Sequence, residues 1–129
     1  MDTNLLIYAH TNLDTPKQHK IQSIISTEQT IISTQVFKEA ANVLFKKFNF
    51  AWQDIQQVLL EMEQNNEVYT NTTTTIQSSC QIANRYGFSF YDSLIIASAL
   101  EVGCSVLYSE DLQHGQVFDK ELTVKNPFV

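Results

Sequence analysis

The stretch DSLIIASALEVGCSVLYSED, residues 92–111, decides the fold expected for this chain. Its first part, Leu94–Leu100, is apolar nearly all round, which is typical of a helix buried against a sheet. Gly103 then ends the helix, because glycine adopts the left-handed C-cap conformation without strain. The following run, Cys104–Tyr108, is interrupted only by Ser105 and predicts a central strand of a parallel sheet. A buried helix that leads directly into a buried strand indicates an α/β fold.

The rest of the chain continues this alternation of helices and strands. An apolar helix follows Asp2-Thr3-Asn4, and amphipathic helices are expected over residues 15–26, 37–48, 52–64 and 72–86. Short strands are expected over residues 30–33, 67–70 and 122–124. With right-handed crossovers between parallel strands, these elements predict one domain over residues 1–129. Its expected architecture is a three-layer α/β/α sandwich with a central, mainly parallel sheet.

The composition, with 43% hydrophobic and 17% charged residues, is that of a soluble globular protein. No apolar run approaches the roughly twenty residues that cross a bilayer, and Leu5–Tyr8 is too short for the apolar part of a signal peptide. We therefore expect a cytoplasmic protein with no membrane partner. Cys80 and Cys104 lack CxxC spacing and lie in mostly apolar surroundings, so they are expected to be buried, reduced thiols.

Four acidic residues lie far apart in the sequence but in similar local settings: Asp2, Glu39, Asp92 and Asp111. Each falls where an apolar strand gives way to a turn or where a helix begins. Because ligands of an open parallel sheet bind beyond the carboxyl ends of its strands, the four carboxylates are expected to converge there. Clustered carboxylates repel one another unless a cation neutralises them, and Mg²⁺ and Mn²⁺ prefer oxygen ligands. The pattern therefore predicts a metal site and metal-assisted hydrolysis, with a phosphodiester as the expected substrate.

Taken singly, each acidic residue also has a purely structural explanation. Asp92 fits an N-cap, Asp111 an Asx turn, Glu39 a favourable charge near a helix N-terminus, and Asp2 a solvated chain terminus. Their order and local sequence favour a shared function over these separate explanations.

The net charge of −6 argues against a general nucleic-acid-binding protein, which normally carries an excess of Lys and Arg. Divalent cations among the four carboxylates would neutralise part of that charge. Contacts with phosphates would fall to six of the eight basic residues, namely Lys17, Lys20, Lys38, Lys46, Lys47 and Arg85. The acidic balance also favours a basic partner protein.

Four segments surround these acidic residues: DTNLLIYA (residues 2–9), STQVFKE (33–39), FYDSLI (90–95) and VLYSEDLQHG (106–115). With the terminal Asn-Pro-Phe of residues 126–128, they closely resemble the PIN-domain family, and in particular the VapC-type toxins of bacterial toxin-antitoxin pairs. The resemblance spans the whole chain, and its most specific part is the Ser-Glu-Asp-Leu-Gln-His-Gly stretch that begins at Ser109.

The resemblance implies a Mg²⁺- or Mn²⁺-dependent endoribonuclease in which Asp2, Glu39, Asp92 and Asp111 hold the metal ions and a water on the metal attacks the phosphate. By similarity, Asn4 and Ser109 would orient carboxylates or water through hydrogen bonds. Glu110 is a candidate for an additional ligand. The implied partners are an RNA substrate, a cognate antitoxin whose C-terminal segment enters the acidic groove, and a second copy in a homodimer.

One feature departs from the family pattern. Members usually carry a short apolar strand before the opening aspartate, whereas Asp2 here follows Met1 directly, so the first strand is nearly absent. Two explanations stay open: the start of the protein lies upstream of Met1, or another element fills the gap.

Two other functions compete with the nuclease. A catalytically silent binding module would use the acidic groove only to capture a partner. A haloacid-dehalogenase-type phosphatase would need a second aspartate two residues after the first, and that position is Asn4. His114 is a candidate proton donor to the leaving group, although a structural role in the turn before Gly115 is favoured.

Overall fold

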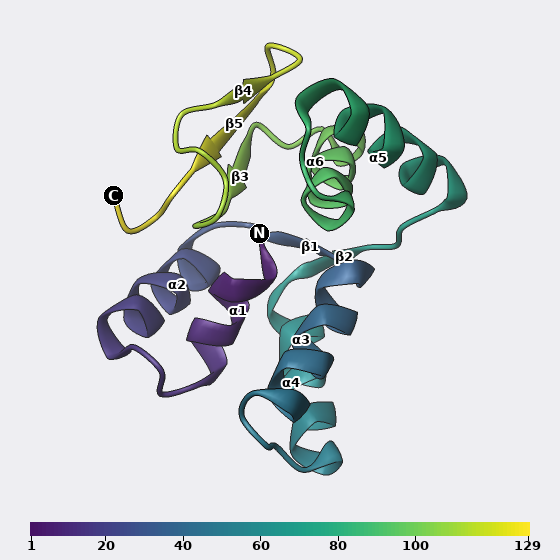
Figure 1. The fold of residues 1–129 in the computed structure, drawn as a ribbon. Coiled ribbons are helices and arrows are strands. Elements are labelled where there is room, and N and C mark those ends of the chain that lie inside the picture. Colours follow the sequence, from purple (N-terminus) through teal and green to yellow (C-terminus); the bar gives the residue numbers. More distant parts are fainter.

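Six helices and five short strands build the fold in the computed structural model, which describes residues 1–129 (Figure 1). The helices are α1 (Thr3–His10), α2 (Thr15–Thr27), α3 (Thr34–Lys46), α4 (Trp52–Asn65), α5 (Thr73–Tyr86) and α6 (Phe90–Val102). The strands are β1 (Ile31–Ser33), β2 (Glu67–Tyr69), β3 (Val106–Tyr108), β4 (Val117–Phe118) and β5 (Leu122–Lys125). The α/β class is confirmed, although helices predominate.

The strands form two separate sheets, so the single central sheet expected from the sequence is only partly present. β1 and β2 pair in parallel, with Ile32 opposite Val68. The other sheet has the order β3-β5-β4, with β3 parallel and β4 antiparallel to β5. The expectation that Cys104–Tyr108 forms a central strand was wrong, because β3 lies at a sheet edge and Val106 is 39% exposed.

Met1 and Asp2 connect the two sheets. The Met1 amino group donates a hydrogen bond to the Ile31 carbonyl of β1 at 3.2 Å, and the Asp2 N–H donates to the Tyr108 carbonyl of β3 at 3.0 Å. These two residues precede α1 without forming a strand. The main chain of Met1 and Asp2 therefore forms hydrogen bonds to both sheets.

The apolar core is divided in the same way. Figure 1 shows α1–α4 with β1 and β2 in the lower half, and α5 and α6 with β3–β5 in the upper half. One buried cluster joins α1, β1, α3 and α4, and another joins α6 to the upper sheet. A smaller cluster fills the α1–α2 interface. The largest fully buried side chains of the two main clusters are Leu6, Ile32, Val36, Leu44, Ile55 and Met62 in the lower one and Ile96, Leu107, Phe118 and Leu122 in the upper one.

Side-chain caps fix where the helices begin. Asp14 accepts a hydrogen bond from the Lys17 N–H at 3.1 Å and caps α2, which begins at Thr15. Ser89 caps α6, because its Oγ accepts from the Asp92 N–H at 3.2 Å. Asp92 therefore lies in the first turn of α6 and is not its N-cap.

The two cysteines are free, but the expectation that both are buried was wrong. Cys80 is exposed on α5 and Cys104 is half-buried. None of the six helices is both long and apolar enough to span a membrane.

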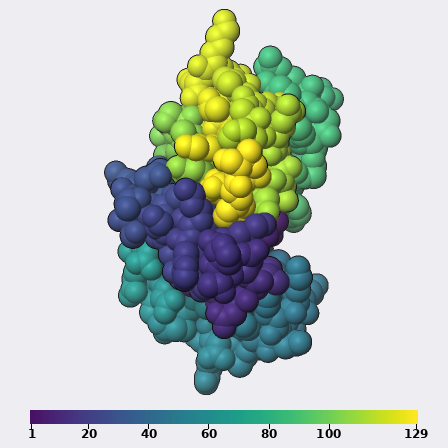
Figure 2. Space-filling model, turned by 90° about the vertical axis from the view of Figure 1, so that its left-hand side faces the viewer, coloured from purple at the N-terminus to yellow at the C-terminus, as the bar shows by residue number.

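The chain termini meet on one face of the molecule. Figure 2 shows the purple N-terminal helices packed against the yellow C-terminal residues. The rings of Tyr8 and Phe128 contact edge to face with centroids 5.7 Å apart. This contact brings α1 close to the segment that follows β5.

Candidate metal centre

Asp2 is a buried carboxylate that caps α1. It is 6% exposed, and its Oδ1 accepts a hydrogen bond from the Thr3 N–H at 2.7 Å. Its Oδ2 accepts from Ser109 Oγ at 2.9 Å, which attaches the start of α1 to the loop after β3. Both donors are neutral, so no cationic side chain neutralises this carboxylate by hydrogen bonding.

Burial raises the pKa of the Asp2 carboxyl above its ordinary value, while the hydrogen bonds from Ser109 and Thr3 oppose that rise. The negative charge of Asp111 raises the pKa of Asp2 further, so the two carboxylates share one electrostatic environment. A cation placed between them would have the opposite effect and favour the ionised form of both.

Ser109 and Asn4 connect Asp111 to Asp2. Ser109 is fully buried, and its Oγ accepts hydrogen bonds from the N–H groups of Asp111 and Leu112, both at 3.2 Å. Asn4 Nδ2 donates to Asp111 Oδ2 at 2.8 Å. The carboxylate of Asp111 itself is on an exposed residue, so this side of the cluster is open to solvent.

Glu39 joins the same cluster from α3. Its Oε1 accepts hydrogen bonds from Thr3 Oγ1 at 3.0 Å and from Gln35 Nε2 at 2.7 Å. Thr3 is buried and adjacent in sequence to Asp2, so Thr3 links Glu39 to the α1 N-terminus. Gln35 lies one helical turn before Glu39 on the same face of α3.

Asp92 lies in the first turn of α6 and makes no side-chain hydrogen bond to the other three acids. Gln35 Nε2 also donates to the Tyr91 carbonyl at 3.1 Å, which attaches the first turn of α6 to α3 beside Glu39. The Asp92 N–H donates to Ser89. The structure thus connects Asp2, Glu39 and Asp111 through hydrogen bonds and places Asp92 at the adjoining helix start.

No three Asp, Glu, His or Cys side chains lie close enough together to hold a metal ion in this arrangement. The hydroxyl and amide donors Thr3, Asn4, Ser109 and Gln35 instead bind the carboxylate oxygens. Sequence reasoning had missed Thr3 and Gln35. A signal existed for both, because Thr3 stands between Asp2 and Asn4 and Gln35 precedes Glu39 by four residues on a helix.

The chemistry of these donors, although not their spacing in this structure, suits a hard divalent cation. The donor set consists of carboxylate, hydroxyl and amide oxygens, without a thiol or an imidazole, and Mg²⁺ and Mn²⁺ prefer oxygen ligands. The buried Asp2 carboxylate has only neutral hydrogen-bond donors, so it would gain most from a cation.

Glu110 is engaged elsewhere in the structure. Lys17 Nζ donates to Glu110 Oε1 at 2.5 Å and to Tyr8 Oη at 3.3 Å, and it lies over the rings of Tyr8 and Phe128. Partial burial acts to raise the pKa of Glu110, but the hydrogen bonds from Lys17 and Tyr8 and the charge of Lys17 outweigh it and lower the pKa. The Glu110 carboxylate thus binds a lysine.

His114 forms a hydrogen bond to the main chain of the segment that follows β5. Its Nδ1 accepts a hydrogen bond from the Asn126 N–H at 3.0 Å, which requires Nδ1 to be unprotonated. Gly115 follows with a φ of 86°, in the left-handed region. The ring therefore holds the loop after Asp111 against the segment after β5.

We expect Ser109→Ala to lower the free energy of unfolding by about 1–3 kcal/mol, because it leaves the buried Leu112 N–H and the Oδ2 oxygen of the buried Asp2 carboxylate without a partner. Urea unfolding of the variant and the parent measures this difference. Ser105→Ala, at an exposed serine just before β3, is the matched control. Equal losses in both variants would contradict the assigned role of the Ser109 hydroxyl.

The PIN domain family model matches residues 1–118 of the chain. PIN domains are generally metal-dependent nucleases. No curated protein matches the chain.

Proposed function

This chain belongs to the PIN domain family, and we propose that it is a Mg²⁺- or Mn²⁺-dependent endoribonuclease, the toxin of a bacterial toxin-antitoxin pair. The family membership supports nuclease activity. The toxin assignment rests on the resemblance of residues 2–9 and 106–115 to VapC-type toxins. The same proposal includes an RNA substrate, a cognate antitoxin, a homodimer and a cytoplasmic location.

The observation that carries the proposal is the hydrogen-bonded connection of acids that lie far apart in sequence. Asp2 and Asp111 meet through Ser109 and Asn4, and Glu39 meets Asp2 through Thr3. A fold gains no stability from collecting carboxylates, because their charges repel and their burial is costly. A cationic ligand gives this arrangement a physical reason.

Each residue then has a defined part in the proposed site. Asp2, Glu39, Asp92 and Asp111 would hold the cation, while Asn4 and Ser109 keep the carboxylates of Asp111 and Asp2 oriented. A divalent cation bound there supplies a water of lowered pKa and neutralises charge that grows on the phosphoryl oxygens. The residues of this chain need to provide no histidine base or serine nucleophile.

A groove beside Glu39 supports single-stranded RNA as the substrate. It encloses about 550 Å³ and is lined by Lys38, Asn42, Phe90 and Tyr91. Phe90 and Tyr91 are 41% and 58% exposed, so their rings are free to stack on unpaired bases, and Lys38 is available to a phosphate. These contacts would offset part of the unfavourable net charge of −6.

A catalytically silent binding module is the second candidate. The observation that favours it is the absence of three metal-binding side chains within reach of one another. The haloacid-dehalogenase-type phosphatase has less support, because Asn4 occupies the position of the general acid and an amide has no acidic proton to give.

Cleavage of RNA in the presence of Mg²⁺ and calorimetric titration with Mn²⁺ together test the proposal. We expect endonucleolytic products in Mg²⁺, none in EDTA, and recovery when Mg²⁺ is restored, with Mn²⁺ binding tighter than the millimolar range. Cleavage by contaminating metal-independent ribonucleases would continue in EDTA, so the chelator is an internal control. Millimolar or weaker Mn²⁺ binding together with no cleavage would leave the binding module as the better assignment.

A further inference from the structure

Helix α2 carries a row of four side chains on one face. They recur at intervals of four, three and four residues and are Lys17, Ile21, Ile24 and Glu28. The two isoleucines are buried in the small cluster between α1 and α2. The charged residues at the two ends of the row lie about 16 Å apart along the helix axis. Both of them contact the same short segment of the chain, residues 108–111, which leads out of β3.

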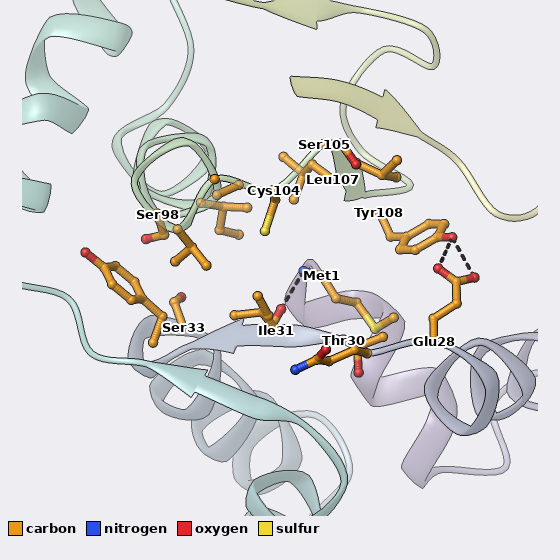
Figure 3. Close-up of a pocket in the computed structure, with 17 residues that line it drawn as sticks. Met1, Glu28, Thr30, Ile31, Ser33, Ser98, Cys104, Ser105, Leu107 and Tyr108 are labelled. Atoms are coloured by element: carbon orange, nitrogen blue, oxygen red, sulfur yellow. Dashed lines mark hydrogen bonds between the residues drawn. The ribbon is translucent and has the colours of Figure 1, made fainter. Parts of the chain in front are cut away.

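Glu28 contacts the last residue of β3. The Tyr108 hydroxyl donates to Glu28, at 2.8 Å and 2.9 Å from the two carboxylate oxygens (Figure 3). The ring of Tyr108 packs against the cluster between α1 and α2. The C-terminal end of α2 is thus attached to the residue before Ser109.

Lys17 contacts the residue after Ser109. Its Nζ donates to Glu110 Oε1 at 2.5 Å and to Tyr8 Oη at 3.3 Å. It also lies 4.7 Å and 4.8 Å from the ring centroids of Tyr8 and Phe128. The ammonium group is therefore engaged within the protein, rather than free for the phosphate contact expected from the sequence.

The segment between these two contacts carries groups of the candidate metal centre on its other side. Successive side chains of an extended chain point in opposite directions. Tyr108 and Glu110 face α2. Ser109 and Asp111 face the metal centre instead, where each has a side-chain hydrogen bond to the start of α1. Four consecutive residues thus alternate between α2 and the acidic cluster.

The Lys17–Glu110 pair adds no net charge beside this cluster. An unpaired lysine would repel a divalent cation, and an unpaired Glu110 would add to the repulsion among the carboxylates. Both side chains are largely covered, with 28% and 25% of their surfaces exposed, so solvent screens their attraction less than on an open surface. The pair is therefore suited to fixing the main chain without changing the charge of the site.

We propose that α2 holds residues 108–111 in place and that Lys17 is a positioning residue for Asp111. Lys17 acts through Glu110, the residue directly before Asp111, and touches neither the cation nor the RNA of the proposed nuclease. Glu28 has the same part at the other end of α2, through Tyr108. The effect on metal affinity rests on the proposed function, whereas the effect on the mobility of the loop does not.

Three substitutions on α2 and α3 separate this role from a general loss of stability. Lys17→Met keeps the length of the side chain but removes its charge and its donors. Lys20→Met makes the same change at an exposed lysine of the same helix. Phe45→Ala is the stability control, because it removes an exposed aromatic contact with Trp52 on α4, away from α2.

Hydrogen exchange without metal is the first measurement. The N–H groups of Asp111 and Leu112 donate to Ser109 Oγ, so their exchange reports on the opening of this loop. We expect Lys17→Met to speed exchange at both amides by about tenfold, because a hydrogen bond to a charged partner is lost. The Lys20 and Phe45 variants should match the parent. Equal exchange in the parent and in Lys17→Met would overturn the proposal, and so would an equal increase in Phe45→Ala.

Calorimetric titration with Mn²⁺ is the second measurement, and the sign of its result is decisive. Loss of a positive charge near the site would by itself tighten the binding of a cation. We expect Lys17→Met instead to weaken Mn²⁺ binding by about tenfold, at the lower end of the range for groups that orient metal ligands. Lys20→Met should bind like the parent.

Tighter Mn²⁺ binding by Lys17→Met would overturn the positioning role. A double variant that also carries Glu110→Gln should bind no more weakly than Lys17→Met, because both changes act through one contact. Weaker binding by the double variant would mean that Glu110 itself holds the cation, which would also overturn the role given to Lys17. A parent that binds no Mn²⁺ would contradict the proposed function, while hydrogen exchange would still decide whether α2 holds the loop.

Discussion

Asp111→Asn is expected to lower the rate of Mg²⁺-dependent RNA cleavage by more than about a hundredfold. Removing a group that merely orients a metal ligand costs about 10–100-fold, so removing the charge of a ligand should cost more. The asparagine keeps the size of the side chain and an oxygen that can accept from Asn4, which preserves the fold. Asp92→Asn is expected to have a similar effect, and initial cleavage rates with urea unfolding of each variant measure both quantities.

Asp119→Asn is the matched control for these variants. Asp119 is an exposed residue between β4 and β5 with a φ of 51°, a conformation that asparagine adopts readily. It loses the same charge at a distance from the cluster, so cleavage should match the parent. If the Asp92 and Asp111 variants also cut as fast as the parent while folded, the nuclease site proposed here is wrong.

Phe118→Ala is expected to lower the free energy of unfolding by about 3–5 kcal/mol, through lost burial and the cavity left behind. Phe118 is 1% exposed and packs edge to face against Tyr86 at 5.1 Å and Phe88 at 6.0 Å between ring centroids. Because domains of this size are stable by only about 5–15 kcal/mol, the variant should be close to unfolding at room temperature. Urea unfolding monitored by circular dichroism measures the loss.

Phe45→Ala provides the comparison at an exposed aromatic side chain. Phe45 is 43% exposed and stacks on Trp52 with ring centroids 4.4 Å apart. Its removal should cost about 1 kcal/mol, since little apolar area is buried and only the stacking is lost. Equal losses for both phenylalanines would mean that the upper core is not organised around Phe118.

Helices were predictable from the sequence because their signals are local. The spacing of apolar residues and the glycines after α5 and α6 are enough to place these elements within a few residues. The helix that begins in the Thr72–Thr75 tract is an example, since Thr72 and Thr75 form a reciprocal capping box at its start.

Sheet order was not predictable, because it depends on pairings between distant residues. The apolar composition of β3 is that of a central strand. Its edge away from β5, however, pairs with no strand and accepts a hydrogen bond only from Asp2. β4 was missed altogether, because two residues carry no periodicity. It pairs with β5 by virtue of the turn at Asp119 and Lys120, where both residues adopt positive φ.

For the candidate site, sequence motifs named the acidic residues but not the contacts that orient them. Ser109 and Asn4 were named by resemblance, and the structure gives each a hydrogen bond to a specific carboxylate. The Lys17–Glu110 pair spans 93 positions and has no local signal, so the diversion of Glu110 to a lysine could be seen only in the fold.

The Asp2–Ser109 hydrogen bond spans 107 positions of the chain. A nascent polypeptide still attached to the ribosome cannot close this bond until residue 109 has emerged, even though α1 is made first and N-terminal segments fold first during synthesis. Asp2 and Asp111 can therefore be brought together only after most of this domain has been synthesised.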